Sequence, residues 1–230
     1  MCTSFVNKEK NIIGMNFDNN GMKYSIKKND SSFVILVNIE GRNMPSFGVT
    51  NEGVFINSQF TKENEEGKYK RTKNAVHMTR LVSEILSKKI NSGEIETILE
   101  DKEIVNVPSM SCHSMLVDSE ENVWIVEPGR PIQKHPHTDS SPVALTNFSL
   151  YDYKTKNEIN GVGIERYNEI KELLNNTSFS TPQEYFKLLR NVSQNGTWKT
   201  DFSLVYSKDE NKVYYCENQE FDNVKEHQFI

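Results

Sequence analysis

The chain has 230 residues, of which 36% are hydrophobic and 26% charged, a composition typical of a globular protein with a sizeable core. Its formal net charge is −5 and it has no long basic run, which argues against nucleic acid as a partner. No apolar run approaches the ~20 residues of a membrane span, and the N-terminus lacks the pattern of a secretory signal. The three cysteines, Cys2, Cys112 and Cys216, are too few for a disulfide framework, so we expect a reducing, cytoplasmic setting.

Blocks of predicted strands alternate with pairs of predicted helices along the chain. Strand-forming residues between polar turns predict strands over residues 2–7, 12–18, 32–39, 47–50, 54–57, 111–117, 122–127, 142–146, 202–206 and 212–215, with weaker alternation over 23–28. Apolar residues three and four apart predict helices over 78–86, around 95–99, over 165–174 and over 185–189, the last of these opened by the segment 181–184. The charged segment 63–71 is interpreted as a solvated loop.

This order of elements predicts the fold class. Blocks of strands followed by pairs of helices are typical of antiparallel sheets covered by helices, which is a layered α+β fold. We find no internal repeat and no linker in the sequence. A length of 230 residues suits one large domain or two small ones, and we expect a single domain over residues 1–230.

The first chemically informative residue is Cys2. If Met1 is removed, Cys2 carries a thiol and a free α-amino group, whose ordinary pKa values lie near ~8.5 and ~8. The amine can then take the proton of the thiol, which is the arrangement of an N-terminal nucleophile. We expect Met1 to be absent from the active protein, because cysteine is small enough for ordinary methionine removal. The alternative is a reduced cysteine that happens to stand second.

Other polar residues have both a chemical and a structural interpretation. Asp18 ends the second predicted strand, so pairing with the first strand would bring its carboxylate near the chain start, although Asp also commonly begins a turn such as Asn19-Asn20-Gly21. His113 adjoins Cys112, but adjacent residues of a strand point to opposite faces and do not act together. Two histidines within residues 135–137 are weak evidence for a metal site, and we expect neither a metal nor a cofactor.

Six short segments follow one another in a specific order. They are Cys2-Thr3, Gly14–Asp18, Asn51–Asn57, Ser114–Asp118 leading to Val126-Glu127, Leu145–Asn147, and Glu165–Tyr167. In this order they resemble the choloylglycine hydrolase family, which groups bile salt hydrolases, penicillin V acylases and related linear-amide hydrolases. The chain is also similar to the acyl-transferring relatives that act on isopenicillin N. Each segment is weak evidence alone, but the common order spans most of the chain.

The resemblance implies a fold and a set of roles. The fold is the αββα sandwich of N-terminal nucleophile hydrolases, in which two antiparallel sheets lie between layers of helices. Cys2 matches the nucleophile, and Asp18 matches the carboxylate that positions its amine. Asn57 and Asn147 match donors to the oxyanion, and Arg166 matches an arginine of the site. One oxyanion donor can contribute ~3 kcal/mol. The structural alternatives are that both asparagines end strands and that Arg166 is a solvated helix residue.

Met15 departs from the pattern of the family. Members usually have an arginine at this position, where its charge would favour the thiolate, and a methionine cannot do this. Either the thiol is less acidic in this chain, or another cation such as Arg166 takes the place of that arginine.

These interpretations together predict a cysteine amidohydrolase. It would cleave the linear C–N amide bond of a small N-acyl compound through a thioester acyl-enzyme. One rival is an acyltransferase, in which an amine intercepts the thioester. Another is a binding protein of the same fold that has lost its chemistry, for which Met15 is the best argument. We expect no nucleic acid or membrane partner. The sequence leaves open whether the protein forms a homo-oligomer.

Overall fold

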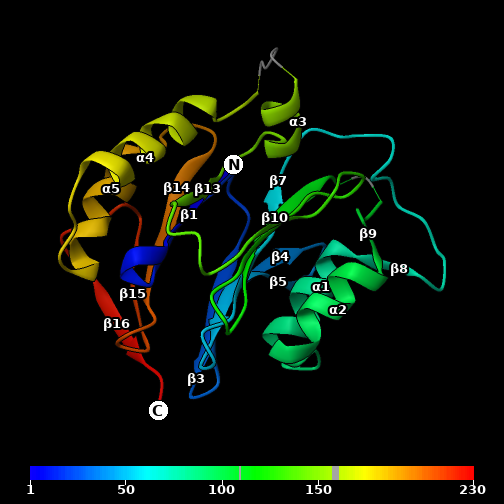
Figure 1. Ribbon diagram of the computed structural model, residues 1–230. Coiled ribbons are helices and arrows are strands. Elements are labelled where there is room, and N and C mark those ends of the chain that lie inside the picture. Colours follow the sequence, from blue (N-terminus) through cyan, green and yellow to red (C-terminus); the bar gives the residue numbers. More distant parts are fainter. Residues whose placement is uncertain (109, 157–160) are drawn as a thin grey trace. The chain divides into compact units, whose positions relative to one another are not determined.

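The chain folds into two units, each built around its own antiparallel sheet (Figure 1). The computed structural model describes residues 1–108, 110–156 and 161–230. Within these residues, the first unit comprises Met1–Met22, His137–Phe148 and 161–230. The second unit comprises Lys23–Pro136 and 149–156. In the described part of the chain, no helix is both long and apolar enough to cross a bilayer.

The sheet of the first unit places the N-terminal strand between two neighbours. Its strands follow the spatial order β13, β1, β2, β14, β15, β16, and every adjacent pair is antiparallel. Their bounds are β1 (Cys2–Asn7), β2 (Ile12–Asn19), β13 (Val143–Leu145), β14 (Lys199–Ser207), β15 (Lys212–Glu217) and β16 (Lys225–Gln228). The predicted hairpin of the first two strands is confirmed, and its register sets Cys2 opposite Phe17.

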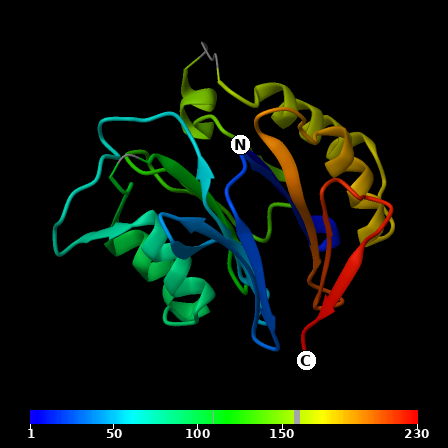
Figure 2. The same cartoon turned by 180° about the vertical axis from the view of Figure 1, so that it is seen from behind.

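Two helices cover one face of this sheet. They are α4 (Ile164–Asn176) and α5 (Tyr185–Asn191), which lie beside β14 in the view from behind (Figure 2). A short 3-10 turn with a capping box and a proline at its start leads into α5, as the segment 181–184 predicted. Apolar residues of both helices pack against Phe5 of β1 and Val205 of β14. This packing fixes α4 over the start of the chain.

The strand alternation separates two faces of the first sheet. Phe5 packs in the helix-covered core, and the side-chain amide of Asn16 donates to the carbonyl oxygen of Leu189 on α5 at 2.7 Å. Cys2 pairs with Phe17, the residue that follows Asn16. Successive residues of a strand point to opposite faces, so the side chain of Cys2 lies on the face opposite to Asn16. The thiol therefore points away from α4 and α5.

The sheet of the second unit follows the order β12, β11, β10, β6, β5, β4, β3, and β7 also pairs with β10. The bounds of its strands are β3 (Tyr24–Asn29), β4 (Ser32–Ile39), β5 (Arg42–Thr50), β6 (Phe55–Asn57), β7 (Gln59–Phe60), β10 (Cys112–Val117), β11 (Val123–Val126) and β12 (Gln133–His135). Two further strands, β8 (Ala75–His77) and β9 (Glu103–Val105), form a small parallel pair.

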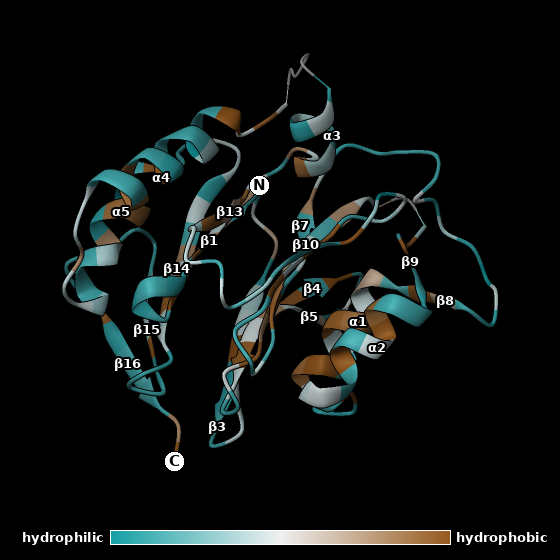
Figure 3. Cartoon of the chain, in the orientation of Figure 1, coloured by the Kyte–Doolittle hydropathy of each residue, from teal (hydrophilic) through white to brown (hydrophobic). Residues whose placement is uncertain are grey.

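The helices of the second unit are α1 (Met78–Leu86), α2 (Ile95–Asp101) and α3 (Leu150–Thr155). The predicted apolar stripe of α1 is confirmed, since its buried residues pack against β6 and β10, and Figure 3 shows the hydrophobic character of this helix. The sequence patterns did not predict α3, β7, β8, β9, β12 or β16.

Candidate active site

Cys2 begins β1, and its backbone is bound from two sides. It lies opposite Phe17 of β2, and its N–H donates to Asn147 Oδ1 at 2.8 Å. Asn147 follows β13, the other neighbour of β1. The thiol is buried, with 3% of the residue exposed. The nitrogen of Cys2 therefore meets a side-chain acceptor in the interior, where a free α-amine would lie after removal of Met1.

Arg166 links the segments that surround Cys2. It lies in the first turn of α4, and its Nη2 donates to Asn147 Oδ1 at 3.0 Å. Its Nη1 donates to the carbonyl oxygen of Cys2 at 3.0 Å and also contacts Thr3 Oγ1. The same nitrogen lies 3.4 Å from Asp18 Oδ2. Only 11% of the Arg166 side chain is exposed, so the interpretation of Arg166 as a solvated helix residue is wrong.

Gly163 makes room for this arginine. Its φ of +91° lies in the left-handed region, and α4 begins at the next residue. A Cβ atom at Gly163 would lie 2.7 Å from Arg166 Nη2 and 3.0 Å from Thr146 Oγ1. A side chain at this position would therefore displace the guanidinium group from its partners.

We expect Gly163→Ala to lower the free energy of unfolding more than Gly21→Ala does. Both glycines have positive φ, which costs an alanine about 1–2 kcal/mol, but no atom lies within 4 Å of a Cβ at Gly21. The alanine at position 163 should also break hydrogen bonds to a buried charged group, each contributing about 1.5–3 kcal/mol. Denaturant unfolding of the two variants measures the difference. Equal losses of stability would mean that Arg166 tolerates the added methyl group.

Asp18 lies at the same end of the sheet, with 1% of the residue exposed. Its Oδ1 accepts from Thr200 Oγ1 at 2.5 Å, and its Oδ2 accepts from the side-chain amide of Gln194. Burial raises the pKa of Asp18 to about 6, although Thr200, Arg166, the chain-terminal amine and Gln194 each act to lower it. The structure thus brings the predicted residues Cys2, Asp18, Asn147 and Arg166 together. It adds Gln194 and Thr200, which no sequence pattern had indicated.

The Cys2 thiol is weakly acidic in this environment. Burial raises its pKa to about 11, which outweighs the opposing effects of the chain-terminal amine, the Asp18 N–H and Arg166. Met15 lies opposite Ser4 and is fully buried, on the same face of the sheet as Cys2. Of the two alternatives that Met15 raised, the structure favours the less acidic thiol. A base must therefore take the thiol proton during any attack near neutral pH.

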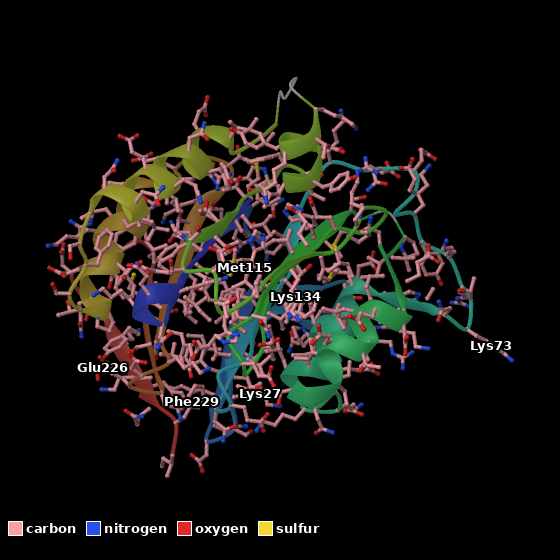
Figure 4. All side chains as sticks on the ribbon, in the orientation of Figure 1. Lys27, Lys73, Met115, Lys134, Glu226 and Phe229 are labelled. Atoms are coloured by element: carbon pink, nitrogen blue, oxygen red, sulfur yellow. The ribbon has the colours of Figure 1, made fainter. Side chains whose placement is uncertain are left out.

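Asn57 belongs to the second unit, where it ends β6 and is fully buried. Its Oδ1 accepts from the backbone N–H of Met115 on β10 at 2.9 Å, and Figure 4 labels Met115. The side-chain oxygen thus binds β10 at the point where β6 ends and β7 begins. The asparagine has a structural task in the second unit, and its role as an oxyanion donor stays a prediction.

His113 is paired with a carboxylate in the second unit. Its Nδ1 lies 3.4 Å from Glu127 Oε1, and both side chains are buried. The backbone N–H groups of Leu150 and Tyr151 donate to Glu127 at 2.9 and 2.8 Å. Burial raises the pKa of Glu127, but His113 and the N–H donors outweigh this effect, so the pKa lies below its ordinary value. Cys112 packs instead in the core under α1, as opposite strand faces require.

Across the described ranges, no three His, Cys, Asp or Glu residues are placed to hold a metal.

No family model matches the chain, and no curated protein matches it either. Among solved structures, a cysteine-to-alanine variant of the conjugated bile acid hydrolase from Clostridium perfringens matches with a TM-score of 0.66 and 13% identity, covering 99% of this chain and 92% of that one. The penicillin V acylase from Agrobacterium tumefaciens matches with a TM-score of 0.65 and 13% identity, covering 95% and 83%. An N-acylethanolamine-hydrolyzing acid amidase ortholog from Caenorhabditis elegans matches with a TM-score of 0.62 and 14% identity, covering 90% and 93%.

The chain has the N-terminal nucleophile hydrolase fold. The α+β class is confirmed, and so is the resemblance to choloylglycine hydrolases at the level of the fold. At 12–14% identity, residues cannot be transferred on similarity alone.

Proposed function

We propose that the chain is an amidohydrolase in which Cys2, freed from Met1, cleaves the C–N bond of a small N-acyl compound. The observation that carries the proposal is that Asn147 and Arg166 bind the backbone of Cys2, while Arg166 also pairs with the buried Asp18 carboxylate. A cysteine that merely stood second in the chain would not need a buried arginine at its carbonyl group, itself paired with a buried carboxylate. The N-terminal nucleophile hydrolase fold and its amide-cleaving neighbours support the same reaction class.

The α-amine of Cys2 is the proposed base. Burial lowers the pKa of the α-ammonium group at Met1, and the nitrogen of Cys2 lies deeper, bonded to Asn147. A neutral amine there can take the proton of the thiol as the sulfur attacks the substrate carbonyl. The resulting ammonium then gives that proton to the leaving nitrogen as the C–N bond breaks. Water attacks the thioester, releases the carboxylic acid and restores the thiol.

Asn147 is the proposed donor to the oxyanion. Its Oδ1 accepts from two groups that can only donate, the N–H of Cys2 and the guanidinium group of Arg166. These partners fix the orientation of the amide and direct its Nδ2 away from them. A neutral donor of this kind stabilises the charge that develops on the substrate oxygen. Asn57 keeps a proposed role as a donor through its backbone N–H, while its side-chain oxygen accepts a hydrogen bond from Met115.

A panel of chromogenic N-acyl amides with varied acyl chains tests the proposed function. We expect turnover, together with an acyl adduct on the Cys2 peptide in mass spectra of quenched enzyme. Added amines should reveal an acyltransferase, since they would divert the thioester from water to a new amide. Absence of turnover across the panel, with Cys2 no more reactive toward alkylation than Cys112 and Cys216, would instead indicate a binding protein. The small number of cysteines supports a cytoplasmic setting for this chemistry.

We expect the active enzyme to lack Met1. With Met1 attached, the nitrogen of Cys2 is an amide that cannot accept a proton, and the amine of Met1 lies elsewhere, 2.9 Å from the carbonyl oxygen of Asp18. Intact-mass measurement on active preparations should give a chain that begins at Cys2. A fully active preparation that retains Met1 would exclude the α-amine as the base and would make Asp18 the next candidate.

A further inference from the structure

The Asp18 carboxylate is held by Gln194, which lies between α5 and β14, and by Thr200 of β14. Thr200 Oγ1 donates to Oδ1 at 2.5 Å, and the side-chain amide of Gln194 donates to Oδ2. Thr200 is fully buried and lies opposite Asp18 in the register of β14 and β2. We call Gln194 and Thr200 the Asp18 clamp.

The two clamp residues also bind each other. The backbone N–H of Gln194 donates to Thr200 Oγ1 at 2.8 Å, and the backbone N–H of Thr200 donates to the carbonyl oxygen of Gln194 at 2.9 Å. Gln219 adds a donor to the same carbonyl at 2.9 Å. These three hydrogen bonds hold the clamp residues in place without involving Asp18.

The hydrogen bonds of the clamp select the ionised form of Asp18. The hydroxyl oxygen of Thr200 accepts a hydrogen bond from the backbone N–H of Gln194. The hydroxyl hydrogen of Thr200 is therefore directed at Asp18, where Oδ1 acts as the acceptor. Gln194 and Arg166 also present donors to Oδ2. A proton on Oδ2 would compete with these two donors for the lone pairs of that oxygen. Hydrogen bonding to the charged form of a buried acid offsets the cost of burying its charge.

We infer that Gln194 and Thr200 are positioning residues of the reaction, which hold Asp18 as an oriented carboxylate beside the α-amine of Cys2. The inference rests on the proposed function and extends it. An ionised Asp18 stabilises the ammonium that forms when the amine takes the thiol proton, so the clamp acts through Asp18 on the first chemical step. Neither clamp residue needs to touch the substrate.

The clamp makes a pH-dependent prediction. The charged and titratable groups near Asp18 are Arg166, the chain-terminal amine and the Cys2 thiol. Activity that requires the carboxylate falls as the pH drops through the pKa of Asp18, which burial holds above its ordinary value. Loss of a donor to the carboxylate raises this pKa, so the acid limb of the rate profile moves to higher pH.

Thr200→Val removes the hydroxyl group at nearly constant volume, and Thr200→Ser keeps it. We expect Thr200→Val to move the acid limb of kcat/KM upward by roughly half a pH unit or more, with Thr200→Ser restoring the wild-type profile. The pKa of Asp18 itself should rise equally in ¹³C NMR titrations of carboxyl-labelled aspartate, with the resonance assigned by Asp18→Asn. Gln194→Glu should raise it further, because a second carboxylate would lie beside the first.

Ser203→Ala is the matched control. Ser203 lies on the same strand, and its buried hydroxyl donates to Asn16 Oδ1 at 2.6 Å, without contact to Asp18. It should lose stability without any shift of the acid limb. If Thr200→Val changes neither the acid limb of kcat/KM nor the pKa of Asp18 measured by NMR, the proposed role of the clamp is wrong, even if turnover is robust. An NMR shift in a protein that hydrolyses nothing would show that Thr200 controls the ionisation of Asp18, but it would reject the proposed function and with it the positioning role.

Discussion

Cys2→Ala is expected to abolish turnover of every N-acyl substrate while the fold stays intact. The substitution removes only the sulfur atom, and the backbone contacts of Cys2 with Asn147 and Arg166 do not require it. The remaining chain then has no nucleophile beside the α-amine. Steady-state turnover and circular dichroism of the variant, compared with wild type, test this expectation.

Two other cysteines provide the controls. Cys112 packs in the helix-covered core of the second unit, and Cys216 packs in that of the first unit. Cys112→Ala and Cys216→Ala should therefore lower stability through a small cavity and leave kcat within a few fold of wild type. Activity of Cys2→Ala at that same level would rule out the proposed mechanism.

Asn147→Ala is expected to lower the acylation rate by ~100-fold or more, as the loss of one oxyanion donor does. Alanine, however, also removes the Oδ1 atom that binds the nitrogen of Cys2 and Arg166. Asn147→Asp separates the two roles, because it keeps an acceptor and loses the Nδ2 donor. Stopped-flow measurement of acyl-enzyme formation should show a similar loss in both variants.

The contrasting result for Asn147 is equally informative. If Asn147→Asp acylates at the wild-type rate while Asn147→Ala is slow, the amide serves only to hold the amine and Arg166. The oxyanion would then be stabilised by another group, with the backbone N–H of Asn57 the first to test. Wild-type rates in both variants would leave Asn147 as a residue that merely ends a strand.

The elements predicted well are those whose cause is local. Contiguous residues carry the 3.6-residue period of α1 and the alternation and turn of the β1–β2 hairpin. The hairpin alone brings Asp18 near Cys2. The parallel pair β8–β9 is different, because each strand has three residues and gains its partner from a segment far along the chain. No local pattern marks strands of that length.

The candidate site was predictable to the same degree. Cys2 and Asp18 follow from chemistry and a hairpin, whereas Asn147 and Arg166 depended on the resemblance to a family. Thr200 meets Asp18 across 182 residues of sequence, through the pairing of β2 with β14. A threonine and a glutamine carry no chemical signature of their own, so only the tertiary structure assigns them to Asp18.

The position of β1 inside its sheet has a consequence for Cys2, the proposed nucleophile. A chain terminus is normally the most mobile part of a domain. Here Ser4–Val6 pair with β13 on one side and β2 pairs on the other, while Asn147 holds the nitrogen of Cys2. The conformational entropy of the first residues is therefore lost when the protein folds, not each time a substrate binds. Cys2 is thus held as firmly as a residue in the middle of a sheet, and in the proposed reaction it would attack without first having to be ordered.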